Sequence, residues 1–309
     1  MTGCLTTVRG MAKQQDEPAF QVSQKARNVF VVDVALEGRQ GEALFLLSGD
    51  RHHDNPHTDH ALELRHLQMA KDQGMGIVDV GDLFCAMEGR ADPRRHRSGV
   101  RPEHATVPDY FDSLVRHAAD FYAPFAKNFI VIGLGNHETA VLKNQETNLT
   151  ERLCERMTTL SKHKVYPGGY GNWIIFRATI NTRRFSLIMK TFHGSGGGGL
   201  MTADVLRTRR IASWTPDADV IVGGHTHDQW WMALARERLQ TLNGTYRVEL
   251  DTQHHVRTGT YKDEYGDGFS GFHVERGAPP KPTGAVVMRI FLENMGQDRH
   301  RLACDFRRA

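Results

Sequence analysis

The sequence is poor in the features that mark export, membrane insertion or a disulfide framework. Of its 309 residues only four are cysteines, and no two of them stand at CxxC spacing. No apolar run approaches the roughly 20 residues that cross a bilayer. Residues 1–25 lack the apolar centre of a secretory signal. We therefore expect free thiols, no membrane-spanning segment and a cytoplasmic protein.

An excess of one charge is lacking too, since 39 Lys and Arg against 36 Asp and Glu give a formal net charge of +3. So small an excess does not by itself predict a nucleic-acid-binding protein. A nucleotide-binding P-loop is missing, because the glycine run that begins at Gly194 lacks the Gly-Lys-Ser/Thr ending. That run either lets backbone approach a ligand or is a flexible connector. The chain is rich in histidine, with 17 residues, and histidine is the commonest metal ligand.

Strand-like runs alternate with helical patterns over the first two-thirds of the chain. β-Branched and aromatic runs predict strands at 29–36, 43–47, 77–80, 129–133, 173–180, 185–191 and 220–222. Apolar periodicity predicts helices at 61–73, 107–122, 146–160 and 203–211. This alternation is typical of a layered α/β domain. Four successive strands, at 230–233, 246–250, 255–260 and 285–291, predict an antiparallel or mixed second half.

One domain from 26 to 309, after a polar and flexible segment at 1–25, is the simplest organisation. Two stretches look like insertions: 88–105 carries several arginines, and 263–282 is rich in glycine and proline. Loops of this length in a compact domain are usually functional or disordered. The arginines either contact phosphate or form a solvated basic loop.

Oxygen and imidazole donors follow five of the predicted strands, each in a turn marked by glycine or serine. In chain order they are Asp50, His52, Asp82, Asn136, His193, His225 and His227. In open α/β sheets, ligands gather at the loops that leave the carboxyl ends of strands. In an extended segment, Asp50 and His52 would point the same way, as would His225 and His227. Each motif alone is common, but the set predicts two metal ions side by side, which is a centre that attacks phosphorus.

The order of the motifs resembles the calcineurin-like metallophosphoesterase superfamily, whose pattern is DxH, GD, GNH(D/E), a separate His and GHxH. Here the resemblance runs from about Leu44 to Asp228. It implies a four-layer α/β/β/α sandwich of two mixed sheets, with a dimetal site at the carboxyl ends of the strands. One metal would be held by Asp50, His52 and His227. The other would be held by Asn136, His193 and His225, and Asp82 would bridge the two.

The same resemblance implies the chemistry. His137 would contact the phosphate or protonate the leaving oxygen, and Glu138 would orient His137 through a carboxylate–imidazole hydrogen bond. A hydroxide that bridges the metals would attack phosphorus in line. The mixed nitrogen and oxygen donors favour two divalent ions, manganese first, with iron, zinc or nickel as alternatives.

The fold leaves the substrate open. The superfamily's Ser/Thr protein phosphatases follow their GD with a DRG element, whereas here Leu83-Phe84-Cys85 follows Asp82. We expect hydrolysis of a phosphodiester in nucleic acid or a nucleotide. The alternatives are a phosphomonoesterase, acting on small molecules or proteins, and a non-catalytic scaffold. The run Asp92-Pro93-Arg94-Arg95 and the segment 261–282 look similar to phage-encoded members. The predicted substrate contacts are Arg90, Arg94, Arg95 and His53.

Overall fold

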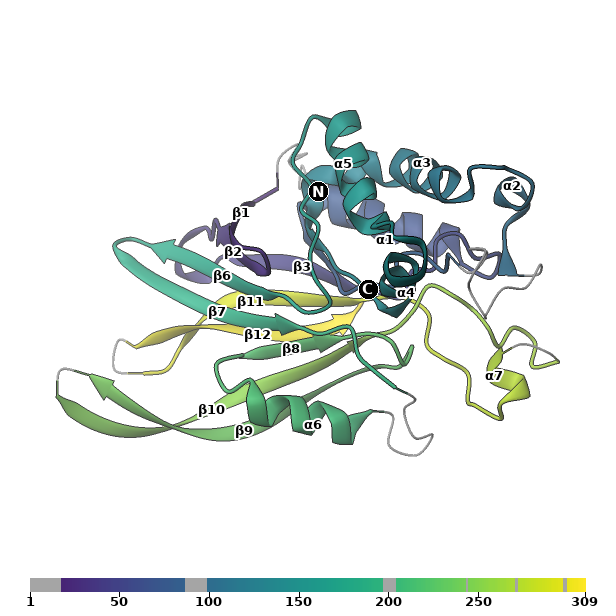
Figure 1. The fold of residues 1–309 in the computed structure, drawn as a ribbon. Helices are drawn as coiled ribbons and strands as arrows, with labels where there is room; N and C mark the ends of the chain where they lie inside the picture. Colours follow the sequence, from purple (N-terminus) through teal and green to yellow (C-terminus); the bar gives the residue numbers. More distant parts are fainter. Residues whose placement is uncertain (1–17, 87–98, 197–203, 243, 270–271, 297–298) are drawn as a thin grey trace, which may run out of the picture.

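The structure of the protein is a computed structural model that describes residues 18–309 except 87–98, 197–203, 243, 270–271 and 297–298. Two β-sheets lie face to face, and helices cover the outer face of each sheet (Figure 1). The helices on one side are α1 (His60–Asp72), α3 (Tyr110–Tyr122), α4 (Asn136–Gln145) and α5 (Leu149–Ser161). On the other side lies α6 (Val205–Trp214). The predicted four-layer sandwich of two mixed sheets is confirmed.

The larger sheet has seven strands in the order β1-β2-β6-β7-β8-β10-β9. They are β1 (Phe20–Ala26), β2 (Val29–Val34), β6 (Trp173–Ile180), β7 (Arg183–Thr191), β8 (Val220–Gly223), β9 (Gln229–Leu242) and β10 (Thr245–Thr258). β8 runs parallel to both of its neighbours, whereas β9 and β10 form an antiparallel hairpin. The expected mixed second half is therefore present.

The smaller sheet has five strands in the order β12-β11-β3-β4-β5. They are β3 (Glu42–Ser48), β4 (Gly76–Asp79), β5 (Phe129–Ile132), β11 (Val286–Asn294) and β12 (His300–Arg308). β3, β4 and β5 are parallel, so their carboxyl ends meet at one edge. The short helices are η1 (Gly38–Gln40), α2 (Pro102–Ala105), η3 (Ala123–Asn128) and α7 (Phe272–Glu275).

Strands β4, β5 and β8 are only four residues long, and every residue in them is buried. Parallel strands that are covered on both faces have continuous apolar sequences, without the alternation of apolar and polar residues seen in half-exposed strands. Their sequences GIVD, FIVI and VIVG follow this rule. These short strands carry the loops that follow them to a common edge of the sandwich.

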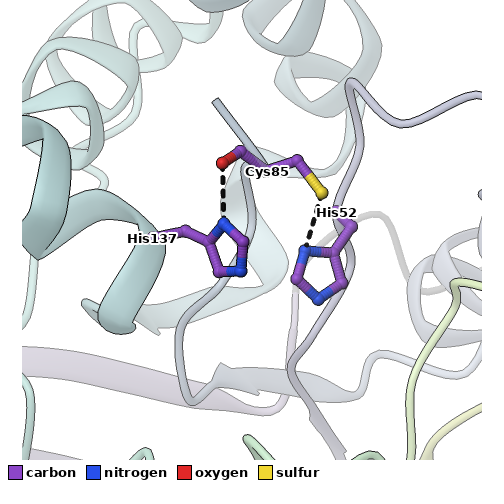
Figure 2. A group of neighbouring side chains, drawn as sticks. All are labelled: His52, Cys85 and His137. Atoms are coloured by element: carbon purple, nitrogen blue, oxygen red, sulfur yellow. Dashed lines mark hydrogen bonds between the residues drawn. The ribbon is translucent and has the colours of Figure 1, made fainter. Parts of the chain in front are cut away.

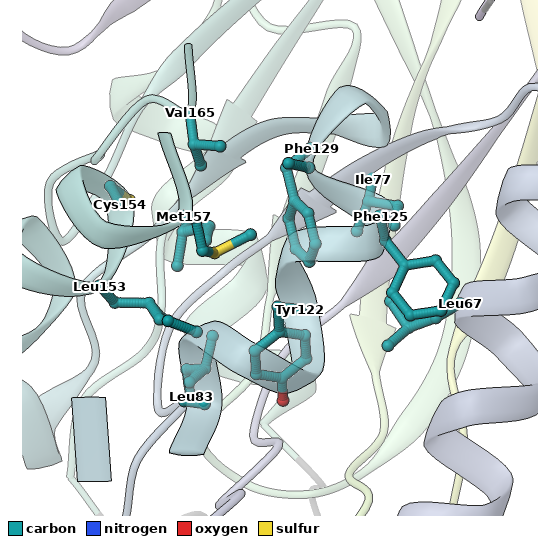
Figure 3. Packing of buried hydrophobic residues seen from close by; sticks show 14 of the residues in the cluster. Leu67, Ile77, Leu83, Tyr122, Phe125, Phe129, Leu153, Cys154, Met157 and Val165 are labelled. Atoms are coloured by element: carbon teal, nitrogen blue, oxygen red, sulfur yellow. The ribbon is translucent and has the colours of Figure 1, made fainter. Parts of the chain in front are cut away.

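Three hydrophobic clusters fill the three interfaces between the layers. The first packs helices α1, α3 and α5 on the smaller sheet, with Tyr122, Phe129 and Met157 among its members (Figure 3). The second fills the space between the sheets, where the rings of Phe45 and Phe176 lie 4.6 Å apart. The third joins α6 to the larger sheet. The layers are thus held by apolar packing at every level.

The structure corrects several element boundaries. β1 begins at Phe20, so residues 20–25 form a paired strand and do not belong to a flexible segment. The strands predicted at 246–250 and 255–260 are parts of one strand, β10, which continues through 251–254. Helix α4 begins at Asn136, where the sequence predicts a turn. No described helix is long and apolar enough to span a membrane.

Candidate metal centre

The seven predicted donors come together at the edge where the carboxyl ends of both sheets meet. They follow β3 (Asp50, His52), β4 (Asp82), β5 (Asn136), β7 (His193) and β8 (His225, His227). The donors therefore come from two sheets that pack against each other. The sequence brings them together because each one lies just after the carboxyl end of a strand, and three of these strands, β4, β5 and β8, are buried throughout.

The first group consists of Asp50, His52 and His227, whose candidate ligand atoms all lie within 4.8 Å of one another. Nε2 of His52 is 3.1 Å from Nε2 of His227, which in turn is 3.5 Å from Oδ1 of Asp50. Asp50 is fully buried and His52 is 2% exposed. These are the three residues predicted for one metal.

The second group consists of Asp82, His193 and His225, again within 4.8 Å of one another. Nε2 of His193 lies 3.1 Å from Oδ2 of Asp82. The amide oxygen of Asn136 is 3.1 Å from the same Nε2 and 2.6 Å from Nδ1 of His225. All members of the predicted second site therefore meet at one point.

The backbone at most of these donors is left-handed, not extended. Asp50, His52, Asp82, His225 and His227 have φ between +47° and +74°. The expectation that extended segments aim these side chains is therefore wrong. Left-handed residues other than glycine cost on the order of 1–3 kcal/mol each and persist only where the surroundings impose them.

Hydrogen bonds between the loops impose this conformation. The amides of Asp50, His52 and His53 donate to the carbonyls of Gly81, Asp82 and Leu83. The Asp50 carboxylate accepts from the amide of His225 at 2.8 Å, so the first loop is also tied to the loop after β8. Each donor loop thus fixes the backbone of another.

Two glycines make room for the carboxylates. A Cβ on Gly135 would collide with the Asp82 carboxylate, and one on Gly224 would collide with that of Asp50. Neither glycine has a positive φ. These positions therefore need glycine because the backbone passes close to a carboxylate, and not because of the backbone conformation. Any larger residue at either position would displace a donor.

Arg51 stands between Asp50 and His52, and its side chain is fully buried below the loop. Its guanidinium donates to Asp79 at 2.6 Å, to Glu63 at 2.8 Å and to the Ser48 hydroxyl at 2.7 Å. Tyr122 also donates to Glu63, at 2.5 Å. Burial alone would lower the pKa of Arg51, but the two carboxylates raise it, so the group stays charged. Sequence analysis missed this residue because it belongs to no donor motif.

Replacing Arg51 is expected to destabilise the fold. Arg51→Met leaves Asp79 and Glu63 buried without their cation, and we expect a loss of about 3–5 kcal/mol in the free energy of unfolding. Urea denaturation measures it. Arg289→Met is the control, because Arg289 pairs with Asp305 and Glu42 while 42% exposed. That change should cost no more than about 1 kcal/mol. Equal losses in the two variants would contradict the structural role of Arg51.

The electrostatics of the centre suit a divalent cation. Burial alone would lower the pKa of His193, but the adjacent Asp82 carboxylate raises it to about 9. Burial lowers the pKa of His52 well below its usual value, with the charge of Lys262 acting in the same direction, so His52 is neutral as a metal ligand must be. Two buried carboxylates beside four imidazoles and an amide oxygen form a mixed N/O donor set, which fits first-row transition metals.

His137 and Glu138 depart from the predicted pair. Nδ1 of His137 contacts the Cys85 carbonyl at 2.7 Å, and its Nε2 is 3.9 Å from Asp82 Oδ2. The Glu138 carboxylate instead accepts from the amides of Gly135, Asp82 and Phe84 at 2.9, 3.2 and 2.8 Å. Glu138 lies in the first turn of α4, where a carboxylate turns back to cap the helix. The prediction that Glu138 orients His137 is wrong.

Cys85 orients two histidines at once (Figure 2). Its carbonyl meets His137, and its Sγ lies 3.2 Å from Nδ1 of His52. The Asp54 carboxylate holds the Cys85 amide at 2.6 Å. Burial raises the pKa of the Cys85 thiol, so it stays protonated. A metal on Nε2 of His52 requires a proton on Nδ1, and Cys85 Sγ lies where it can accept that proton's hydrogen bond.

We expect Cys85→Ala to weaken metal binding, because it removes the sulfur acceptor and retains the carbonyl. The loss should be roughly 10- to 100-fold in affinity, measured by competition with a chromophoric chelator. Cys154→Ala is the matched control, since Cys154 is an equally buried thiol in the helical layer. Its stability should fall without a change in affinity. Identical affinities in both variants would exclude a role for the sulfur.

Of the four predicted substrate contacts, the structure describes only His53. Arg90, Arg94 and Arg95 lie outside the described residues. His53 is 1% exposed and packs behind the donor loops, with Nε2 3.2 Å from His117 and Nδ1 3.5 Å from Glu63. This burial contradicts the prediction that His53 contacts substrate. Its neighbour His52 faces the centre because the two side chains leave the loop in different directions.

The segment after β10 supplies residues that sequence analysis missed. Ligand atoms of Glu264 and His273 lie within 4.8 Å of each other and of His227. Lys262, 8% exposed, pairs with Glu264 at 2.5 Å. The length and composition of 263–282 pointed to this segment, but no motif identified the individual side chains. Glu264 and His273 therefore flank the centre beside His227.

No protein-family model and no curated protein matches the chain. Similar solved structures include GAP50, the anchor in the inner membrane complex of Plasmodium, with 13% identity, TM-score 0.42, and coverage of 86% of this chain and 84% of that one. A predicted phosphoesterase of Streptococcus pneumoniae has 8% identity and TM-score 0.31 over 86% and 99%. Vps29 of Entamoeba histolytica, complexed with Zn²⁺, has 10% and 0.32 over 86% and 98%.

Proposed function

We propose that the protein is a dimetal phosphoesterase that hydrolyses a phosphodiester of nucleic acid or a nucleotide. The observation that carries the proposal is the convergence of all seven donors into two adjoining groups at one edge of the sandwich. The resemblance of the motif order to metallophosphoesterases supports the same activity. Manganese is the first candidate for both ions, and iron, zinc and nickel are the alternatives.

The chain's own residues divide into ligands and a proton donor. Asp50, His52 and His227 would hold one ion. Asn136, His193 and His225 would hold the other. Asp82 would bridge them, because β4 lies between the strands that lead to Asp50 and Asn136. When bound, the ions supply Lewis-acid charge to the phosphoester and make water acidic enough to ionise near neutral pH.

His137 would act on the leaving group. Its Nδ1 proton is held by the Cys85 carbonyl, which directs Nε2 toward the donor groups. A proton on Nε2 would pass to the departing oxygen as the ester bond breaks. The amide of His137 donates to Asp82 Oδ1 at 2.9 Å, so the same residue also positions the bridging carboxylate.

A diester is favoured over a monoester by the loop after β4. Leu83, Phe84, Cys85 and Ala86, the four residues after Asp82, are all fully buried and uncharged, so this part of the loop offers no cation to the substrate. A phosphomonoester carries a charge of about −1.5 to −2 at neutral pH, whereas a diester carries a single charge. The smaller charge suits residues 83–86, which carry no cationic side chain, whereas the arginines at 90, 94 and 95 lie outside the described residues.

Two chromogenic substrates test the class of ester. With added Mn²⁺, we expect a higher kcat/KM on bis-p-nitrophenyl phosphate than on p-nitrophenyl phosphate, and no turnover after chelation. Preference for the monoester would replace the proposal with a phosphomonoesterase. A protein that binds none of the four metals and cleaves neither compound would be a scaffold.

Two substitutions separate coordination from chemistry. His137→Ala should keep the metal content and lower kcat by about 10²- to 10⁴-fold. Asp82→Asn should lose metal, because a neutral amide cannot bridge two cations as a carboxylate does. Metal content is measured by mass spectrometry of the dialysed protein, with His300→Ala on β12 as the unaffected control. Equal metal loss from the first two variants would show that the roles are assigned wrongly.

A further inference from the structure

Helix α6 presents a basic and aromatic stripe that the proposed chemistry does not use. Arg207, Arg210 and Trp214 stand at i, i+3 and i+7, which places them along one side of the helix. Trp214 is 68% exposed. A tryptophan so open to solvent is informative, since large aromatic side chains are usually mostly buried.

The helix is firmly attached, so the stripe has a fixed position. Thr208 and Ile211 are each 2% exposed and form its inner face. Arg257, which is almost fully buried on β10, bonds to Asp204 and to the Thr208 hydroxyl at the start of the helix. The outward side chains of α6 are therefore presented by a rigid element.

The stripe begins beside the metal centre. Nη1 of Arg207 lies 3.4 Å from the carbonyl oxygen of Gly196, and Nε2 of His225 lies 3.0 Å from the same oxygen. One carbonyl thus separates the first arginine from a candidate metal ligand. From Arg207 to Trp214 the helix rises by about 10 Å, which is the span of about three stacked nucleotides.

The stripe retains its positive charge. Arg207 shares Asp204 with Arg257. Across the described part of the chain, no carboxylate pairs with Arg210. Guanidinium groups bind phosphate oxygens through charge-assisted hydrogen bonds. An exposed indole offers a stacking face to any unstacked base.

We propose that this face of α6 binds a single-stranded nucleic acid, with its phosphates on Arg207 and Arg210 and one base on Trp214. The proposal rests on the proposed function, because the strand would continue from the phosphodiester at the metal centre onto the helix. A single strand fits better than a duplex, since bases within a duplex are stacked on each other and cannot stack on Trp214.

Binding of a labelled single-stranded oligonucleotide to the full-length protein in EDTA tests the surface without catalysis. Trp214→Ala should weaken binding about 5- to 100-fold, as expected for the loss of one base–aromatic stack. Trp214→Phe should restore most of it. Arg210→Gln should reduce the dependence of log K on log salt by about 0.7. Fluorescence anisotropy at several salt concentrations measures both effects.

Two matched controls accompany these variants. Arg209→Gln removes the same charge from the same helix, but Arg209 lies on the flank of α6 opposite the stripe. The salt dependence of oligonucleotide binding by this variant should stay closer to that of the wild type. Tyr246→Ala removes an aromatic ring that is 71% exposed at the tip of the β9–β10 hairpin, and binding should not change. Equal effects of Arg209→Gln and Arg210→Gln would mean that binding depends on the net charge of the helix and not on the position of Arg210, which would overturn the proposal.

The outcomes separate this proposal from the proposed function. If the Trp214 and Arg210 variants bind the single strand as tightly as wild type while bis-p-nitrophenyl phosphate is still hydrolysed, the α6 surface is wrong and the activity stands. If the variants lose binding but no metal restores hydrolysis, the surface stands and the activity is wrong. Equal binding of duplex and single strand would also overturn the proposal.

Discussion

The buried guanidinium of Arg51 is the constraint on which the centre depends. One cation fixes two carboxylates from different elements, Glu63 on α1 and Asp79 on β4, directly below the loop that carries the first two donors. A buried charge is tolerated only when such partners surround it. Because the guanidinium cannot move without leaving both acids unpaired, the flanking residues Asp50 and His52 are held with their side chains on the opposite side of the loop. The ion pair thus supports the loop that carries Asp50 and His52.

That rigidity explains the unusual backbone. Left-handed conformations at residues with side chains are unfavourable, yet they recur along the loops after β3, β4 and β8. Each loop receives hydrogen bonds from another, so relaxing one of them would break the pairing of its neighbour. These hydrogen bonds hold the left-handed residues, and with them the donor side chains, in place. Gly135 and Gly224 complete the arrangement, because the absence of a Cβ lets the carboxylates of Asp82 and Asp50 pack against their backbone.

The positions of the donors and a layered α/β domain could be predicted from sequence, because buried parallel strands appear as short apolar runs whose ends converge. The number of layers is implied only by the resemblance of the motif order. Contacts between side chains could not be predicted. Glu138 follows a histidine in sequence, but its place in the first turn of a helix makes backbone amides its nearest partners. His53 adjoins a donor, yet the left-handed turn directs it into the helical layer. Arg51 belongs to no donor motif. Its importance comes from the burial of Glu63 and Asp79, which depends on tertiary packing.

The origin of the donors in both sheets has a mechanical consequence. Each group joins residues from the smaller sheet, such as Asp50 or Asp82, to histidines that follow β7 or β8 in the larger one. An ion held by either group would cross-link the two halves of the sandwich, and sliding one sheet over the other would break its coordination. Ligands that bind only the native state stabilise it in proportion to RT ln(1 + [L]/Kd). Bound divalent ions would then stabilise the whole domain, and its melting temperature would rise with the number of ions bound.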